Sequence, residues 1–212
     1  KQRKNRIAQV YVDFAKKSIE VSEAISSDQP EKEDFLQAYT FYKQALEVEI
    51  DGKLKSEVLF QMGRMMQLAS DYIAAERDYQ NFLITFPANP SLPVNERFFT
   101  ATVNLAVCQI HQGKRLIARK NLTNLLRYSF DESENNKSEL IQTAKFLTVR
   151  TYYLPKTKND PSAKDQQEVA LGIAVAKQFI NQYPKQLRSG QLAFEIGQAY
   201  HSIGQTENAI SA

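Results

Sequence analysis

Apolar residues recur along this chain with the period of an α-helix. They stand three or four positions apart in most segments, as in Leu59, Met62 and Met66, and this spacing places them on one face of a helix. Proline and glycine occur mostly between such segments, where they end or separate helices. We find no segment with the two-residue alternation typical of a half-buried strand. The pattern predicts an all-α protein.

The predicted helices group into hairpins, which span roughly residues 5–50, 53–87, 93–130, 138–184 and 187–212, the last cut short. In three of them a small residue of the first helix is followed twelve positions later by an alanine: Gly63 and Ala75, Ala106 and Ala118, Gly197 and Ala209. We expect these pairs to let antiparallel helices approach closely, because a larger side chain would separate them. A repeat of about 34 residues predicts one right-handed α-solenoid of about five hairpins over the whole chain.

Several helix boundaries are predicted from local chemistry. Segments 82–87 and 179–184 share one order of types: aromatic, aliphatic, two spacers, aromatic, proline. Asp28 and Glu31 suit a capping box, and Ser138 suits an N-cap. Residues 154–165 are predicted to form a loop longer than the connections that this repeat normally has. The loop is either an insertion that binds a partner or an insertion that the fold merely tolerates.

Composition and charge narrow the function classes. Hydrophobic residues make up 42 % of the 212 positions, enough for a continuous core. No apolar run approaches the roughly 18 residues that cross a bilayer. A net charge of +3 is too small and dispersed to predict nucleic-acid binding. The basic cluster of residues 1–6 could be a juxtamembrane or nucleic-acid contact, and we interpret it as a solvated helix start.

The ends of the sequence suggest a piece of a longer protein. It has no starting Met and no signal-peptide pattern, and it stops inside a predicted repeat helix. Membrane association is therefore expected only through missing flanking segments.

No pattern of catalytic, metal-binding or cofactor-binding residues stands out. The two histidines, His111 and His201, fall in different repeats and make a poor zinc site with the single Cys108, which we expect to be a small core residue. The chain has no glycine-rich phosphate loop and no local Ser-His-Asp or Cys-His-Asn arrangement. We predict no enzyme, no cofactor and no metal.

The repeat resembles the tetratricopeptide repeat (TPR). In that family the first helix carries leucine, glycine and tyrosine, and the second carries alanine, an aromatic residue, alanine and a closing proline. The second hairpin fits through Leu59, Met62, Gly63, Met66, Ala75, Tyr79 and Pro87. The third fits less completely, since Gln109 stands where tyrosine is usual and Phe130 where proline is. The fifth fits up to its end, and the first and fourth only in part.

The resemblance implies a binding surface on the concave face, which the first helices of each hairpin line. The positions that would be exposed there are Glu57, Phe60, Arg64, Gln67, Val103, Val107, Ile110, His111, Ile141, Lys145, Thr148, Phe194, Gln198 and His201. Phe60, Val103, Ile141 and Phe194 share one repeat position and could form an apolar strip bordered by Arg64 and Lys145. Such a strip would hold an extended peptide or a helix with acidic flanks. Alternatively, these residues pack against the next hairpin.

We therefore predict a non-catalytic scaffold that binds a peptide or partner protein. Two alternatives stay open: a regulatory or targeting portion of a larger enzyme, and a self-assembling structural module. The residues leave the oligomeric state and the compartment open. A narrower likeness to bacterial cell-envelope TPR proteins, the outer-membrane assembly lipoprotein and the Tol-Pal coordinator, favours the periplasm or cell envelope over the cytoplasm.

Overall fold

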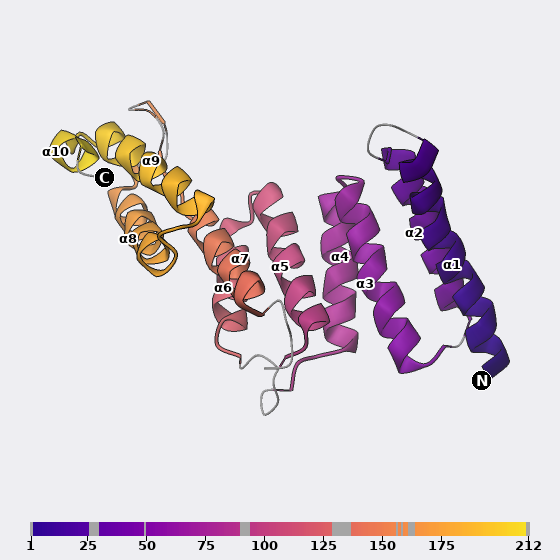
Figure 1. Cartoon of the computed structure of the whole chain (residues 1–212). Coiled ribbons are helices and arrows are strands. Elements are labelled where there is room, and N and C mark those ends of the chain that lie inside the picture. The colour runs from indigo at the N-terminus through magenta and orange to yellow at the C-terminus, as the bar shows by residue number, and fades with distance from the viewer. Residues whose placement is uncertain are drawn as a thin grey trace. The chain divides into compact units, whose positions relative to one another are not determined.

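The computed structural model of the chain (Figure 1) describes residues 2–25, 30–48, 50–89, 94–128, 137–155, 157, 159–160 and 164–210. For residues 2, 21–25 and 137 it describes the backbone only. Over these ranges the chain forms ten α-helices and no strand, which confirms the all-α prediction. The chain divides into two compact units, Lys1–Lys114 with Arg127–Lys137 and Arg115–Leu126 with Ser138–Ala212.

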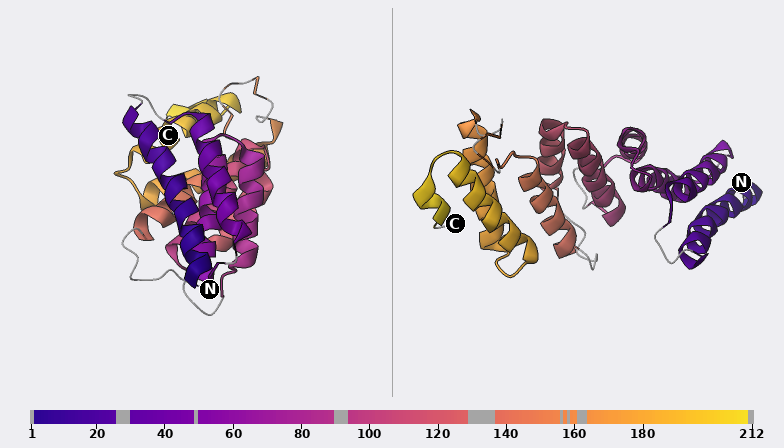
Figure 2. Two further views of the ribbon diagram at one scale, coloured as in Figure 1. Left: turned by 90° about the vertical axis from the view of Figure 1, so that its right-hand side faces the viewer. Right: turned by 90° about the horizontal axis from the view of Figure 1, so that it is seen from above.

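The first unit contains five helices that pack in chain order. They are α1 (Gln2–Ile25), α2 (Lys32–Glu47), α3 (Gly52–Leu68), α4 (Tyr72–Thr85) and α5 (Glu96–His111). Each packs against the next, and α3 also touches α1 and α5 (Figures 1 and 2). The predicted hairpins α1–α2 and α3–α4 are thus present.

Short polar side chains cap the N-terminal ends of three of these helices. The carboxylates of Asp51 and Asp71 and the amide oxygen of Asn95 each accept a hydrogen bond from the backbone N–H three positions on, at 2.9–3.0 Å. These bonds satisfy donors that a helix start leaves open. The capping box before α2 was placed wrongly, because it joins Glu31 to Asp34. Asp28 lies outside the described residues.

Large apolar side chains from α2, α3 and α4 fill the core of the first unit. Tyr42, Leu59, Met62, Tyr79 and Phe82 are all at most 7 % exposed. Cys108 is also fully buried, as predicted, and burial together with the charge of Glu76 raises the pKa of its thiol to about 12. The core is continuous across α1 to α5.

The second unit contains α6 (Arg115–Leu125), α7 (Lys137–Arg150), α8 (Gln166–Gln182), α9 (Leu187–Ser202) and α10 (Thr206–Ile210). Because α7 begins at Lys137, Ser138 lies inside the helix and is not its N-cap. α9 packs against both α8 and α10. Gly197 of α9 would place a Cβ 3.4 Å from the backbone oxygen of Ala209, so this small-residue pair is confirmed. The predicted loop 154–165 lies partly outside the described residues.

The two matching helix ends have the same geometry. The C-cap residue after α4 is Phe86, with φ −127° and ψ 67°, and the C-cap residue after α8 is Tyr183, with φ −132° and ψ 54°. In both, the backbone N–H of the second aromatic residue donates to the carbonyl of the first at 2.9 Å. The ring centroids lie 5.6 Å apart in Phe82–Phe86 and 5.0 Å in Phe179–Tyr183. The proline that follows cannot continue the helix.

Hydrogen bonds and an ion pair of Arg119 fix the end of α7 within the second unit. The Arg119 guanidinium donates to the backbone oxygen of Thr151 at 2.9 Å and to its hydroxyl at 3.1 Å, and it pairs with Glu168 of α8. Its central carbon lies 3.5 Å from the ring centroid of Tyr152. One arginine of α6 therefore fixes both α7 and α8.

Among the helices that the structure describes, none is both long and apolar enough to cross a membrane.

Candidate binding groove

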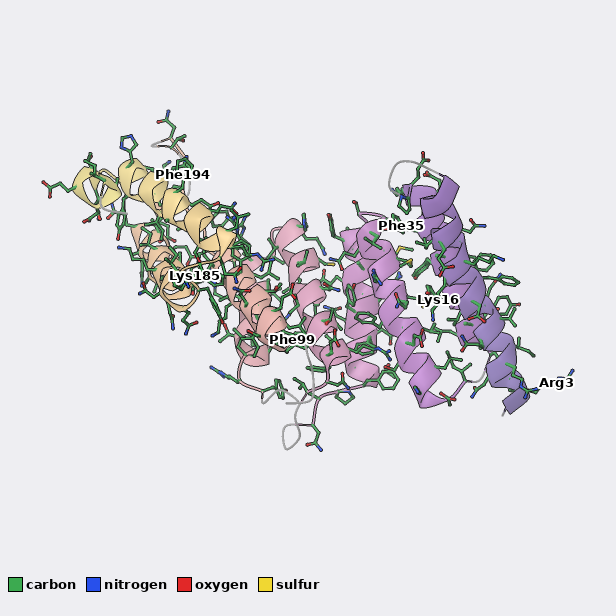
Figure 3. All side chains as sticks on the ribbon, viewed as in Figure 1. Arg3, Lys16, Phe35, Phe99, Lys185 and Phe194 are labelled. Atoms are coloured by element: carbon green, nitrogen blue, oxygen red, sulfur yellow. The ribbon has the colours of Figure 1, made fainter. Side chains whose placement is uncertain are left out.

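A groove opens in the first unit where α1, α2 and α3 meet; we name it the α1–α3 groove. Its volume is about 640 Å³, within the range of about 300–1,000 Å³ of ligand sites. Figure 3 labels two of its lining residues, Lys16 on α1 and Phe35 on α2. The full lining consists of Ala15, Lys16, Ile19, Glu20, Pro30, Phe35, Tyr42, Gln61, Arg64, Met65 and Leu68.

The floor of the groove is apolar and its edge is partly solvated. Tyr42 and Met65 are 3 % and 6 % exposed, and Phe35 is half-buried. Leu68, at the last position of α3, is 46 % exposed. A ligand side chain in the groove would remove this leucine surface from water, which is favourable by about 25 cal/mol per Å².

Contacts at the start of α3 fix how α1 approaches it. The Asn5 side-chain amide donates to a carboxylate oxygen of Asp51 at 2.6 Å, and the Asp51 backbone N–H donates back to Asn5 at 3.1 Å. The other carboxylate oxygen of Asp51 caps α3. Next to this contact, a shallower hollow of about 380 Å³ continues the seam between α1 and α3.

A lysine, an arginine and a glutamate line the groove: Lys16, Arg64 and Glu20. Lys16 pairs with Glu57 of α3 at 2.8 Å, and both side chains are partly exposed. Arg64 and Glu20 are exposed, and neither forms a hydrogen bond or ion pair with another described residue. Because Arg64 forms no ion pair within the described residues, its guanidinium can donate hydrogen bonds to a ligand carboxylate without first breaking one there.

Tyr42 lies at the bottom of the groove. Burial, and to a lesser extent the charge of Glu57, raise the pKa of its hydroxyl to about 12, although the charge of Arg64 acts in the opposite direction. The hydroxyl is therefore protonated at neutral pH. It forms no hydrogen bond with any residue in the described ranges and can donate one to a ligand.

The groove joins an apolar floor to a few polar groups, which is the chemistry of a binding site. In the part of the chain that the structure describes, no three histidine, cysteine, aspartate or glutamate side chains lie close enough to hold a metal ion.

Of the residues predicted for the binding face, Arg64 lines the groove, and Phe60 and Gln67 lie toward α4. The Phe60 ring is half-buried, with its centroid 6.2 Å from that of Tyr79 and 6.0 Å from that of Phe82. The side-chain oxygen of Gln67 accepts a hydrogen bond from the Tyr79 hydroxyl at 2.8 Å.

The predicted residues of α5 differ in exposure. Val103 is 5 % exposed, and Val107 is half-buried. His111 is exposed, and its ring stacks on that of Tyr72, with centroids 4.1 Å apart and planes 3° from parallel.

In the second unit, Phe194 is 68 % exposed, His201 is exposed, and Ile141 and Gln198 are half-buried. Lys145 donates to the side-chain oxygen of Gln182 at 2.9 Å and lines a small hollow of about 180 Å³. The apolar strip of Phe60, Val103, Ile141 and Phe194 draws on both units and stays a prediction.

Sequence reasoning missed the contribution of α1 and α2 to the groove. It assigned the binding face to the second to fifth hairpins and took no position from the first, which matches the repeat only in part. Lys16 and Glu57 are 41 positions apart, so no local spacing indicates that they meet. In the sequence, Tyr42 and Phe35 stand out only as members of a helical apolar pattern, which does not mark them as binding residues.

The fold and groove together define an all-α protein of TPR-like helical hairpins. Three solved structures share this fold: "MamA RS-1 ArsTM double mutant" (TM-score 0.64, 13 % identity, 96 % of this chain and 89 % of that one); "MamA 41-end from Desulfovibrio magneticus RS-1" (0.63, 14 %, 96 % and 89 %); and "MamA MSR-1 C2" (0.56, 14 %, 97 % and 92 %). They confirm the predicted α-solenoid fold class. Neither a family model nor a curated protein matches the sequence.

Proposed function

We propose that this chain is a non-catalytic interaction scaffold that binds a peptide segment of a partner protein in the α1–α3 groove. The groove itself carries the proposal, because it combines an apolar floor with polar groups that have no partner in the described protein. An all-helical TPR-like fold supports it, since such folds offer extended binding surfaces.

The groove contacts suggest how a peptide would sit. One apolar side chain would lie on Phe35 and Leu68, where half-exposed apolar surface is available. Arg64 and the Tyr42 hydroxyl would donate hydrogen bonds to the peptide. The other predicted positions, Val107 and His111 in the first unit and Lys145, Phe194 and His201 in the second, would offer further binding surface on each unit by itself. A location in the periplasm or cell envelope stays a prediction from the family resemblance.

Selection from a display library of random, unstructured peptides tests this function. The chain is compared with Leu68→Glu, which places a charge at the edge of the groove. Its matched control is Ile73→Glu on α4, where the isoleucine is 74 % exposed and outside the groove. Circular dichroism verifies that both variants fold.

We expect peptides to be enriched by the native chain and by Ile73→Glu, and to bind Leu68→Glu at least tenfold more weakly. Equal binding of these peptides to both variants would place their site elsewhere, and the absence of any enriched peptide would contradict the proposed function itself.

A further inference from the structure

α1 carries a second exposed surface on the side opposite the groove. Ile7, Val10 and Phe14 are 45 %, 48 % and 50 % exposed. Their spacing of three and four residues puts them on one stripe of the helix. Ala8, Val12 and Ala15, which are fully buried, lie on the other side. We name Ile7, Val10 and Phe14 the outer stripe.

Positive charge lies along one edge of the outer stripe. Arg3, Arg6 and Lys17 are exposed, and none of them forms a hydrogen bond or ion pair with another residue in the described part of the chain. Figure 3 labels Arg3 near the start of α1. Asp13 of the same helix accepts a hydrogen bond from Gln9 at 2.9 Å. Arg3, Arg6 and Lys17 therefore leave positive charge beside the outer stripe that no ion pair among the described residues neutralises.

We propose that the outer stripe binds a helix of a partner protein whose own apolar stripe is flanked by aspartate or glutamate. The three–four spacing is that of a helix–helix seam, in which side chains of one helix fill the gaps of the other. Acidic flanks would pair with Arg3, Arg6 and Lys17, which form no ion pair with another described residue.

Phe14 is the expected anchor of this contact. Its ring centroid lies 5.8 Å from that of Phe41 on α2, so the protein already holds the exposed ring in one place. A fixed aromatic side chain loses little conformational freedom on binding, and aromatic residues commonly dominate interfaces.

Two other occupants fit the outer stripe less well. A second copy of α1 packed antiparallel across Val10 would bring Arg3 close to Lys17 of the copy, and like charges that meet in an interface disfavour it. A membrane-surface helix presents a broad apolar face with bulky side chains. The outer stripe is a single row of three residues.

The test uses a display library of helical peptides with fixed leucines at seam positions and random residues at the flanking ones. It is screened against the native chain, the charge-reversed variant Arg3→Glu/Arg6→Glu/Lys17→Glu, and Phe14→Ser. The matched control is Ile84→Ser on α4, where an isoleucine 78 % exposed lies far along the chain from α1. Circular dichroism and sedimentation velocity establish that each variant folds and report its oligomeric state.

We expect the native chain and Ile84→Ser to enrich acidic flanking residues, the charge-reversed variant to enrich lysine and arginine, and Phe14→Ser to weaken binding at least tenfold. Three results would overturn the proposal: the same flanking residues with and without charge reversal, no enriched helix, or a native dimer that Phe14→Ser dissociates. Binding of the native chain to phosphatidylserine vesicles, lost in Phe14→Ser, would also overturn it in favour of a membrane. None of these outcomes concerns Leu68, so the groove function is tested separately.

Discussion

Gly63 of α3 lies directly against the ring of Tyr79 on α4. A Cβ at position 63 would come within 2.7 Å of ring carbon Cδ1, closer than real Cβ atoms approach. The sequence paired Gly63 with Ala75, but the ring that requires the glycine belongs to the residue one helical turn later. Tyr79 is fully buried, and its hydroxyl donates to Gln67 and accepts from Asn104. Both hydrogen bonds are made at the hydroxyl, so they fix that end of the buried ring.

Gly63→Ala should destabilise the first unit by about 1–2 kcal/mol, because overpacking costs about 1–3 kcal/mol and replacing a helical glycine returns up to about 1 kcal/mol. Urea denaturation measures the difference. Gly52→Ala, at the first position of α3 with open space around it, is the control and should change stability little. Equal stability of Gly63→Ala and the native chain would show that the Tyr79 ring can move.

Tyr79→Phe keeps the buried ring and removes both hydrogen bonds of its hydroxyl, at 2.8 Å to Gln67 and 3.0 Å from Asn104. We expect a loss of about 1–2 kcal/mol, since each such bond contributes about 0.5–1.5 kcal/mol net. Tyr11→Phe is the control, because the Tyr11 hydroxyl forms no hydrogen bond within the described ranges. Similar thermal midpoints for the two variants would contradict the prediction.

Glu76→Gln should make stability less dependent on pH. Burial raises the pKa of Glu76, but hydrogen bonds from Lys114, Gln109 and Gln112 and the charge of Lys114 outweigh it, so the pKa lies below its ordinary value. A carboxyl whose pKa is lowered on folding contributes stability above its unfolded pKa, about 4.3 for glutamate. That contribution is lost as the pH falls through the folded value.

The native chain should therefore exceed Glu76→Gln in stability by about 1–3 kcal/mol at pH 7. The side-chain amides of Gln109 and Gln112 donate to the two carboxylate oxygens, and a glutamine at position 76 would replace one of these acceptors with another amide donor. The difference should shrink as the pH falls below about 4. Urea denaturation from pH 3 to 7 measures it, with Glu20→Gln as an exposed control. A difference that is constant over this range would show that the charge of Glu76 contributes nothing.

Arg119→Lys should loosen the end of α7. The planar guanidinium bonds to both oxygens of Thr151 and to Glu168 at once, and an ammonium group cannot reproduce that geometry. We expect a loss of about 1–3 kcal/mol and faster amide hydrogen exchange at Thr151 and Tyr152. Lys120→Ala, on an exposed position of α6, is the control. Unchanged exchange at those two amides would contradict the role assigned to Arg119.

Much of the fold could be predicted because its signals are local. Apolar spacing placed the helices, glycine marked the turns at Gly113 and Gly204, where φ is +76° and +81°, and proline marked the ends of α4 and α8. Each depends on residues within one or two helical turns of each other. The same locality explains the boundary errors, since several polar residues near a helix start can cap it and only backbone geometry selects Glu31.

The groove could be predicted only in part. Arg64 was found through its repeat position, whereas Lys16 and Tyr42 belong to a hairpin that matches the repeat poorly. The exposed face of α1 was equally hidden, because Ile7, Val10 and Phe14 have the same helical spacing that marks a buried face elsewhere in the chain. Periodicity indicates that a helix has an apolar face, and it does not say whether a neighbour covers it.

The sequence by itself determined that this chain is all-helical, that its helices pair, and that a small residue at Gly197 lets α9 approach Ala209 of α10. These follow from backbone geometry and side-chain size over short distances. Only the tertiary structure decided that Gly63 faces Tyr79, that Lys16 meets Glu57 across 41 positions, and that the outer stripe stays about half exposed. Those facts depend on how helices pack, because packing between segments distant along the chain sets which surfaces stay open for a ligand.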